Sequence, residues 1–269
     1  MLGISSFSYG WSVGVPGSIP QKPLNVLDLL DRAQKYGVKL VQIGDNLPLH
    51  TLSNSILQEF EDRSSKLGIK IEVGTRGLKP DILKKYLSLA TRFKSQILRI
   101  VIDMPDYKPS ENEIITILKD FAPGYKKYGV TLAIENHDRL TVKVLANIIQ
   151  SVGSEHIGIC LDTVNSFGAS EGTETVVATL GPLTVNLHVK DYVIERAYHK
   201  MGFTVSGTPA GRGMLNIPWI LEKLQSFNRQ PNAILELWTP PEKEITDTLV
   251  KEEMWVKESI DYLRTLIKD

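Results

Sequence analysis

Short apolar segments rich in β-branched residues recur along this chain and alternate with longer segments of helical period. The apolar segments are continuous hydrophobic runs, which is typical of parallel strands that are covered on both faces. Eight segments are predicted to be strands: LGISSF (2–7), LVQIGD (40–45), IKIEVGT (69–75), ILRIVID (97–103), TLAIENH (131–137), IGICLD (157–162), TVNLHVKD (184–191) and AILELW (233–238).

The amphipathic segments between these runs are predicted to be helices. They cover about 23–36, 51–67, 80–94, 110–128, 141–151, 170–180 and 216–226, with a last helix that includes 256–267. Pro23 is suited to open the first helix, and Ser110 with Glu113 has the spacing of a capping box. Gly37, Gly68 and Gly129 each stand just before a strand, where glycine commonly ends a helix.

The order of elements predicts an α/β fold, namely a single (β/α)8 TIM barrel that forms one domain over residues 1–269. No Pro/Gly/Ser-rich linker or block of like charge marks a domain boundary. The rival is an open, doubly wound sheet. That fold usually has a glycine-rich phosphate loop after its first strand, and the segment SYGWSVGVPGS (8–18) does not match such a loop.

In a (β/α)8 barrel the active site lies at the carboxyl ends of the strands. Four consecutive predicted strands have an ionisable residue there: Glu135, Asp162, His188 and Glu236. Three converging buried carboxylates would repel one another, and a divalent cation would relieve that repulsion. The mixed oxygen and nitrogen ligands suit Mn²⁺, Mg²⁺ or Co²⁺, with Zn²⁺ as a further option. Taken singly, each carboxylate could instead be an ion-pair partner or a helix cap.

At these residues the sequence resembles the xylose isomerase-like TIM-barrel superfamily of sugar isomerases and epimerases, which also includes endonuclease IV. The resemblance rests on LAIENH (132–137), GICLDT (158–163), NLHVKD (186–191) and LELW (235–238), in the order of that family. It implies metal ligation by Glu135, Asp162, His188 and Glu236. It also implies that Glu135 and Glu236 exchange protons with the substrate from opposite sides.

Two departures from the family pattern narrow the function. Many epimerases of this group have a histidine three residues after the strand-6 aspartate, where this chain has Asn165. The amide can bind a substrate hydroxyl but is a poor ligand for a second metal. Endonuclease IV needs a histidine-rich three-metal cluster, and this chain has only five histidines. A DNA phosphodiesterase is therefore disfavoured.

Several residues near the strand ends are candidates for substrate contacts. Lys190 would place a positive charge near the metal, where it could act in catalysis by stabilising a substrate carboxylate or a developing oxyanion. It could equally pair with Asp191. The expected substrate-binding residues are His137, Asn165, Arg212, Asp45 and Tyr9. His137 could equally face solvent, and plain packing is the default for Tyr9.

Two further expectations concern the surroundings of the site. Glu72 and Arg99 are expected to form a buried structural pair between neighbouring strands. The long segment 191–216, with four glycines, is expected to be an irregular specificity loop or lid on the catalytic face.

Charge and composition restrict the partners. Lys plus Arg and Asp plus Glu are both 31, so the net charge is zero, which argues against a basic nucleic-acid-binding domain. The single cysteine forbids an intrachain disulfide. No apolar run approaches the roughly 20 residues of a membrane span, and the first residues do not form a secretory signal. A cytoplasmic protein with a small-molecule partner is expected, and whether it forms a homo-oligomer stays open.

Three functions follow from the sequence. The first is a metal-dependent isomerase or epimerase of a small ketose or keto-sugar acid that works through an enediolate. The second is a lyase that decarboxylates a 3-oxo sugar acid, because CLDTVNSFG (160–168) and ILELWTPPE (234–242) resemble 3-oxo-isoapionate decarboxylases. The third is a sugar-binding barrel without turnover, which the complete ligand set disfavours.

Overall fold

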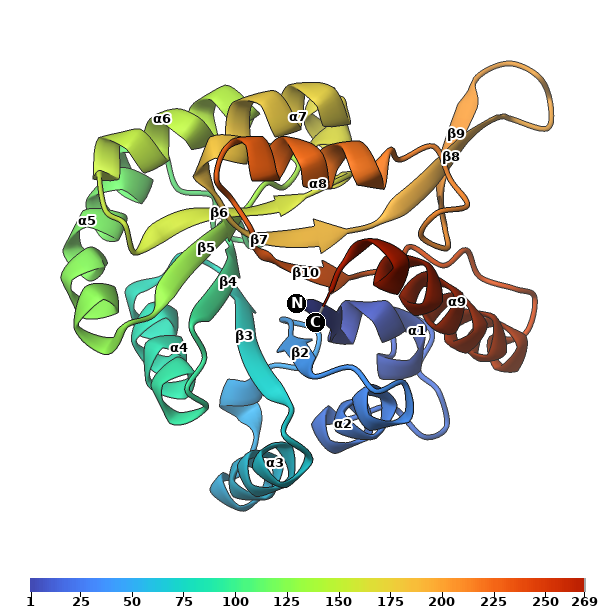
Figure 1. The fold of residues 1–269 in the computed structure, drawn as a ribbon, viewed down its shortest axis with the longest axis horizontal. Coiled ribbons are helices and arrows are strands. Elements are labelled where there is room, and N and C mark those ends of the chain that lie inside the picture. The colour runs from blue at the N-terminus through green and yellow to red at the C-terminus, as the bar shows by residue number, and fades with distance from the viewer. Residues whose placement is uncertain (269) are drawn as a thin grey trace.

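Eight parallel strands close into a barrel in the computed structural model, which describes residues 1–268 (Figure 1). Around the barrel the strand order is β1-β10-β7-β6-β5-β4-β3-β2. The strands are β1 (Leu2–Ser5), β2 (Leu40–Ile43), β3 (Lys70–Arg76), β4 (Ile97–Val101), β5 (Thr131–Glu135), β6 (Ile157–Asp162), β7 (Thr184–Val189) and β10 (Asn232–Leu235). Each falls on a predicted strand, and the (β/α)8 barrel is confirmed.

Helices surround the barrel and cover its outer face (Figure 1). They are α1 (Gly10–Val13), α2 (Val26–Lys35), α3 (Asn54–Leu67), α4 (Pro80–Arg92), α5 (Glu111–Tyr128), α6 (Val142–Val152), α7 (Thr173–Leu180), α8 (Ile217–Ser226) and α9 (Ile245–Leu266). Short 3-10 turns η1 (Ser6–Tyr9), η2 (Leu49–Thr51), η3 (Asn165–Ala169) and η4 (Gly181–Leu183) complete the connections. Within residues 1–268, no helix combines the length and the apolar character that crossing a membrane would require.

Local sequence signals fix several helix ends. The Ser110–Glu113 capping box is present at the start of α5, where each residue bonds the backbone N–H of the other. Gly68 and Gly129 end α3 and α5 in the left-handed conformation, which glycine adopts without steric cost. Pro23 does not open α2. Asn25 does so instead, because its side chain accepts hydrogen bonds from the N–H groups of Leu27 and Asp28.

The interior of the barrel contains a polar layer below the strand ends. Gln42 on β2 stands in register with Glu72 on β3, and Asn186 on β7 stands in register with Asn232 on β10. These four side chains hydrogen-bond to one another across the barrel. The apolar residues of the strands and the inner faces of the helices form the surrounding core.

The segment after β7 differs from expectation. In place of an irregular lid, residues 191–208 contain an antiparallel hairpin of β8 (Asp191–Arg196) and β9 (Phe203–Thr208), which projects from the barrel (Figure 1). Cross-strand pairs such as Ile194 with Val205 and Arg196 with Phe203 organise it, the latter through a cation–π contact.

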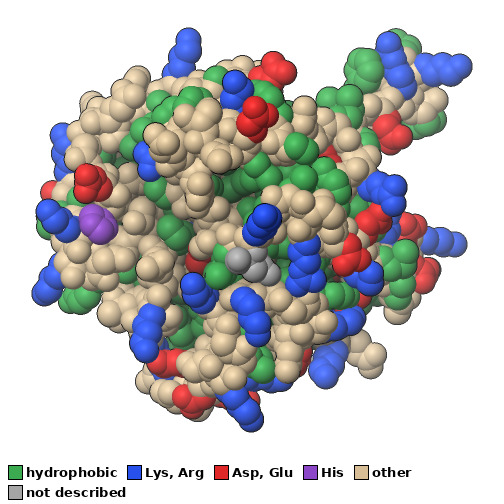
Figure 2. Space-filling view, in the orientation of Figure 1, with side chains coloured by type: hydrophobic (Ala, Val, Ile, Leu, Met, Phe, Trp, Pro, Cys, Tyr) green, Lys and Arg blue, Asp and Glu red, His purple; other side chains and the backbone are tan. Residues whose placement is uncertain are grey.

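Charged side chains are dispersed over the visible surface. Figure 2 shows Lys and Arg interspersed with Asp and Glu over one face of the barrel, with hydrophobic and basic side chains on the projecting hairpin. At the hairpin, Tyr198, Met201 and Phe203 are largely exposed.

Candidate metal centre and active site

Four ionisable side chains meet inside the barrel at the carboxyl ends of neighbouring strands. Glu135 and Asp162 are the last residues of β5 and β6, His188 lies near the end of β7, and Glu236 follows β10 directly. Asp162 stands opposite His188 in the strand register. All four are at most 2% exposed. The structure thus brings together the four residues that the sequence predicts as metal ligands, which we call the strand-end cluster.

The cluster is organised around the imidazole of His188. Its Nδ1 atom lies 3.3 Å from Glu135 Oε2, 3.3 Å from Glu236 Oε1 and 3.9 Å from Asp162 Oδ2. One candidate ligand atom from each of Asp162, His188 and Glu236 lies within 4.8 Å of the other two. Glu135, Cys160 and His188 form a second such triplet. The spacing allows several of these atoms to contact one ion.

A buried nitrogen without a hydrogen-bond partner supports a cation at this position. Within residues 1–268, His188 Nδ1 is buried without a hydrogen-bond partner, and the buried oxygens Asp162 Oδ2 and Glu236 Oε2 are paired with the ammonium of Lys190. Such a nitrogen is costly to bury unless something else satisfies it. Two carboxylate oxygens and one imidazole nitrogen are suitable donors for a divalent ion. The residues present therefore fit a metal site.

Two buried cations balance the carboxylates. Arg99 on β4 donates from Nε to Glu135 Oε2 and from Nη1 to Asp45 Oδ1, at 2.6 Å in the second case. Lys190 Nζ forms ion pairs at 2.8 Å with both Asp162 Oδ2 and Glu236 Oε2. The three carboxylates of the cluster thus face two cations, of which Arg99 is shared with Asp45.

The electrostatic surroundings keep these groups charged. Burial by itself would lower the pKa of Lys190, but Asp162 and Glu236 outweigh it and raise the pKa above its ordinary value. Burial would raise the pKa of Glu135, but Arg99, His188 and Lys190 together outweigh it and lower the pKa. Lys190 is therefore a fixed positive charge rather than a proton carrier at neutral pH.

Neighbouring polar groups hold the carboxylates in place. Asn165 Nδ2 donates to Glu135 Oε1 at 2.6 Å, and Ser5 Oγ donates to Glu236 Oε1 at 3.0 Å. Asp162 Oδ1 accepts from the backbone N–H groups of Val164 and Asn165, both at 2.9 Å. Asp162 thus caps the turn that follows β6 and still presents its second oxygen to the cluster. Sequence reasoning missed Ser5, although a polar residue at the end of an apolar strand was a usable signal.

The other sequence-predicted residues lie at varying distance from the cluster. Asp45 contacts Arg99 and Arg76 and so joins the cluster through Arg99. His137 is partly exposed and pairs with Asp138 at 2.9 Å. Neither residue touches the cluster directly.

Tyr9 and Arg212 require correction. The ring of Tyr9 is fully buried and lies under Arg32 of α2, with 5.8 Å between the guanidinium and the ring centroid. Arg212 has a 70% exposed side chain that pairs with Glu258 of α9. Both residues make these contacts away from the strand-end cluster.

The expected pair between Glu72 and Arg99 is also absent. Arg99 stands opposite Gly74, two residues further along β3 than Glu72, and therefore belongs to the layer of Glu135. Glu72 accepts instead from three amides in the layer below. Asp191 likewise does not pair with Lys190, because its carboxylate accepts the backbone N–H groups of Tyr192, Gly211, Gly213 and Leu215.

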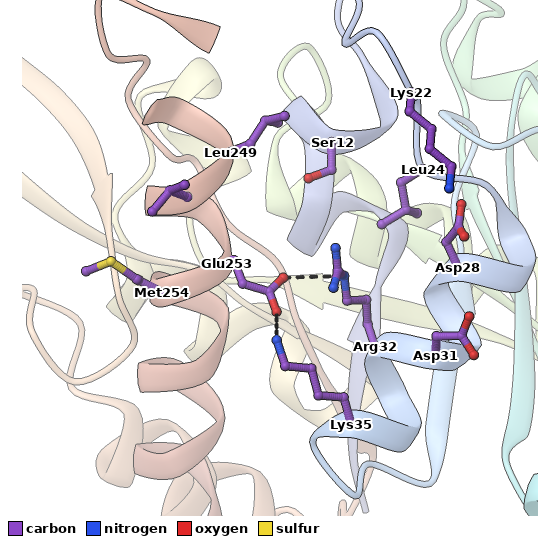
Figure 3. Close-up of a pocket in the computed structure, with 11 residues that line it drawn as sticks. Ser12, Lys22, Leu24, Asp28, Asp31, Arg32, Lys35, Leu249, Glu253 and Met254 are labelled. Atoms are coloured by element: carbon purple, nitrogen blue, oxygen red, sulfur yellow. Dashed lines mark hydrogen bonds and ion pairs between the residues drawn. The ribbon is translucent and has the colours of Figure 1, made fainter. Parts of the chain in front are cut away.

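A separate hollow of about 540 Å³ lies outside the barrel between α2 and α9 (Figure 3). Its charged groups are largely paired, since Glu253 bridges Arg32 and Lys35 in Figure 3. Its lining includes none of the strand-end cluster. The clustered titratable groups inside the barrel remain the candidate active site.

Comparisons with known proteins agree with this architecture. The chain is 29% identical to the 3-oxo-isoapionate decarboxylase of Pectobacterium atrosepticum, over 98% of this chain and 95% of that protein. A D-psicose 3-epimerase with D-tagatose from Clostridium cellulolyticum H10 superposes with a TM-score of 0.73 at 14% identity, over 99% of both chains. A xylose isomerase-like TIM barrel protein from Mycobacterium smegmatis in complex with magnesium gives 0.71 at 14% identity, over 97% and 96%.

The two solved structures share the fold at low identity. A family model described as xylose isomerase-like TIM barrel matches residues 30–266, which is most of the chain. The match spans the strands that bring Glu135, Asp162, His188 and Glu236 together. This chain belongs to the xylose isomerase-like TIM barrel family.

Proposed function

We propose that this protein is a divalent-metal-dependent decarboxylase of a small 3-oxo sugar acid. Asp162, His188 and Glu236, whose candidate ligand atoms lie within 4.8 Å of one another, would hold the ion, with Glu135 as the fourth ligand. Mn²⁺ is our first choice of ion, with Mg²⁺, Co²⁺ and Zn²⁺ as alternatives. When bound, the ion would stabilise negative charge that develops on a substrate oxygen.

The net charge of the site is the observation that favours an acidic substrate. The carboxylates of Glu135, Asp162 and Glu236 face the cations of Arg99 and Lys190. Without a metal ion, these five groups have a net charge of about −1. A divalent ion would reverse this to one positive charge, which complements a carboxylate better than a neutral sugar. The full-length similarity to a 3-oxo-isoapionate decarboxylase supports the same choice.

Decarboxylation does not require the protein to remove a proton from a substrate carbon. In a 3-oxo acid, the bond between the α-carbon and the carboxylate breaks, CO₂ leaves, and the electron pair forms an enediolate with the ketone. Lys190 would offset the growing negative charge, since its ammonium stays protonated. A proton then adds to the carbon that lost CO₂. That proton would come from water, and Glu236 is the residue we propose to relay it.

A metal-dependent ketose isomerase or epimerase is the second candidate. Glu135 and Glu236, which would be the two bases, both lie 3.3 Å from the same nitrogen of His188. The similarity in fold to a D-psicose 3-epimerase is compatible with it. Against it, both oxygens of Glu135 are engaged, one by Arg99 and one by Asn165, so proton transfer there would first break a buried contact.

A single assay separates the two candidates. Purified protein with Mn²⁺ is incubated in D₂O with a panel of 3-oxo sugar acids and the corresponding ketoses, while CO₂ and solvent deuterium in the products are measured. The proposal predicts CO₂ release and one deuterium at the carbon that lost it. Deuterium exchange in a ketose without CO₂ release would favour the second candidate. Turnover in neither class would contradict both.

A matched pair of variants ties the activity to the site. Glu236→Gln should abolish turnover, because the amide cannot relay the proton that completes the reaction. Glu222→Gln makes the same chemical change at an exposed position on α8 and should retain full activity. Equal activity of the two variants would exclude the proposed role of Glu236.

A further inference from the structure

A chain of buried amides stands behind His188 on the side away from the carboxylates. The two ring nitrogens of His188 have different surroundings. Nδ1 faces the strand-end cluster and makes no hydrogen bond within residues 1–268. Nε2 lies 2.7 Å from Oε1 of Gln42, which reaches across the barrel interior from β2. The direction of this one hydrogen bond depends on how the Gln42 amide is oriented.

Glu72 determines that orientation. Gln42 Nε2 donates to Glu72 Oε2 at 2.9 Å and to Asn186 Oδ1 at 3.0 Å. A flipped amide would turn its oxygen toward both of these oxygens, and a carboxylate has no proton to offer in return. Gln42 must therefore present its oxygen to His188, and an oxygen at 2.7 Å requires a proton on Nε2.

The remaining contacts of Glu72 reinforce the arrangement. Its carboxylate also accepts from Asn186 Nδ2 at 3.0 Å and from Asn232 Nδ2 at 2.7 Å. The bond from Asn186 fixes that amide as well, so that its oxygen is available to Gln42 Nε2. The Glu72 carboxylate, which can only accept hydrogen bonds, thus orients the amides of Gln42 and Asn186. The Gln42 amide in turn orients the imidazole of His188.

We propose that Glu72, acting through Gln42, fixes His188 as the tautomer with its proton on Nε2, so that the Nδ1 lone pair points into the strand-end cluster. Glu72 and Gln42 are positioning residues and touch neither ion nor substrate. The importance of this tautomer rests on the proposed function, because the Nδ1 lone pair matters when it ligates a cation. A histidine ligand is generally held by a hydrogen bond to its other nitrogen, and loss of that bond typically costs about 10–100-fold in metal affinity.

This orienting role accounts for the carboxylate of Glu72 in the polar layer below the strand-end cluster. A neutral amide there could donate to or accept from Gln42 equally well, and both tautomers of His188 would be accessible. The Nδ1–H tautomer would point a proton at Glu135 and Glu236, and that proton would have to leave before an ion could bind. The Gln42–Glu72 pair removes this competing state.

The test reads the tautomer directly. Long-range ¹H–¹⁵N spectra of ¹⁵N-histidine-labelled, metal-free protein, at a pH high enough for a neutral ring, distinguish the protonated from the unprotonated nitrogen. His188→Gln identifies the His188 signals among the five histidines. Gln42→Leu removes the acceptor, and Glu72→Gln removes the group that orients it. Asn232→Ala is the control, since it deletes one bond to Glu72 and leaves both partners of Gln42 in place.

The proposal expects Nε2–H in the wild type and in Asn232→Ala, and Nδ1–H or a mixture in the other two variants. Mn²⁺ titration should show about tenfold or greater weakening in Gln42→Leu and Glu72→Gln only. Nδ1–H in the wild type would overturn the proposal, as would Nε2–H in both variants with unchanged Mn²⁺ affinity. If no protein bound Mn²⁺, the proposed function would lose its metal, and the spectra would still decide the tautomer.

Discussion

Replacing Arg99 by leucine should destabilise the protein strongly. The Arg99 side chain is 3% exposed and contacts two carboxylates, one of which, on Glu135, is fully buried. Removing one partner of a buried ion pair typically costs about 3–5 kcal/mol, because the other charge is left uncompensated. Asn165 still donates to Glu135, so we expect the lower end, about 3 kcal/mol. For a protein of this size that lowers the Tm by roughly 6–12 °C.

Urea and thermal unfolding of the metal-free protein measure this loss. Arg63→Leu is the matched control, because Arg63 pairs with Asp31 at the surface and should contribute less than about 1 kcal/mol. Saturating Mn²⁺ should restore part of the stability of Arg99→Leu, by about 2.7 kcal/mol at one hundred times the Kd. Adding Glu135→Gln to Arg99→Leu should also recover stability, since no buried charge is then left unpaired. A loss in Arg99→Leu no larger than in Arg63→Leu would refute the electrostatic reasoning.

Two further predictions concern charge near the site. Lys190→Met removes an ammonium that lies 2.8 Å from two proposed ligand oxygens. The Mn²⁺ affinity measured by titration should therefore rise about tenfold, while the rate of CO₂ release should fall. Weaker Mn²⁺ binding would contradict this prediction. For Asp45, burial would raise the pKa, but Arg99 and Arg76 outweigh it and lower the pKa below its ordinary 3.8. Its stabilising contribution is therefore present above about pH 4 and is lost as the pH falls through the folded-state pKa. The difference in unfolding free energy between the wild type and Asp45→Asn should be full at pH 6 and should shrink below pH 4; a constant difference would argue against the ion pairs.

The barrel could be predicted because its strands are covered on both faces and appear as apolar runs. The strand-end cluster could be predicted for a related reason. Glu135 and Asp162 interrupt such runs at the point where parallel strands present their carboxyl ends. Polar residues at those positions are exceptions to the pattern, and the exceptions form the candidate site.

Register could not be predicted from a single sequence. Glu72 and Arg99 are on adjacent strands, and their charges suggested a pair. The observed register sets Arg99 opposite Gly74, and its guanidinium reaches Glu135 on the neighbouring strand. Glu72 lies one layer lower among the amides. Partners in a barrel depend on which layer each side chain occupies, and that depends on the stagger of all eight strands.

The most direct test of the account is anomalous diffraction from crystals soaked in Mn²⁺. The account predicts one strong peak within coordination distance of Asp162 Oδ2, His188 Nδ1 and Glu236 Oε2, with Glu135 beside it. Fully soaked crystals with no peak among these four side chains would contradict it.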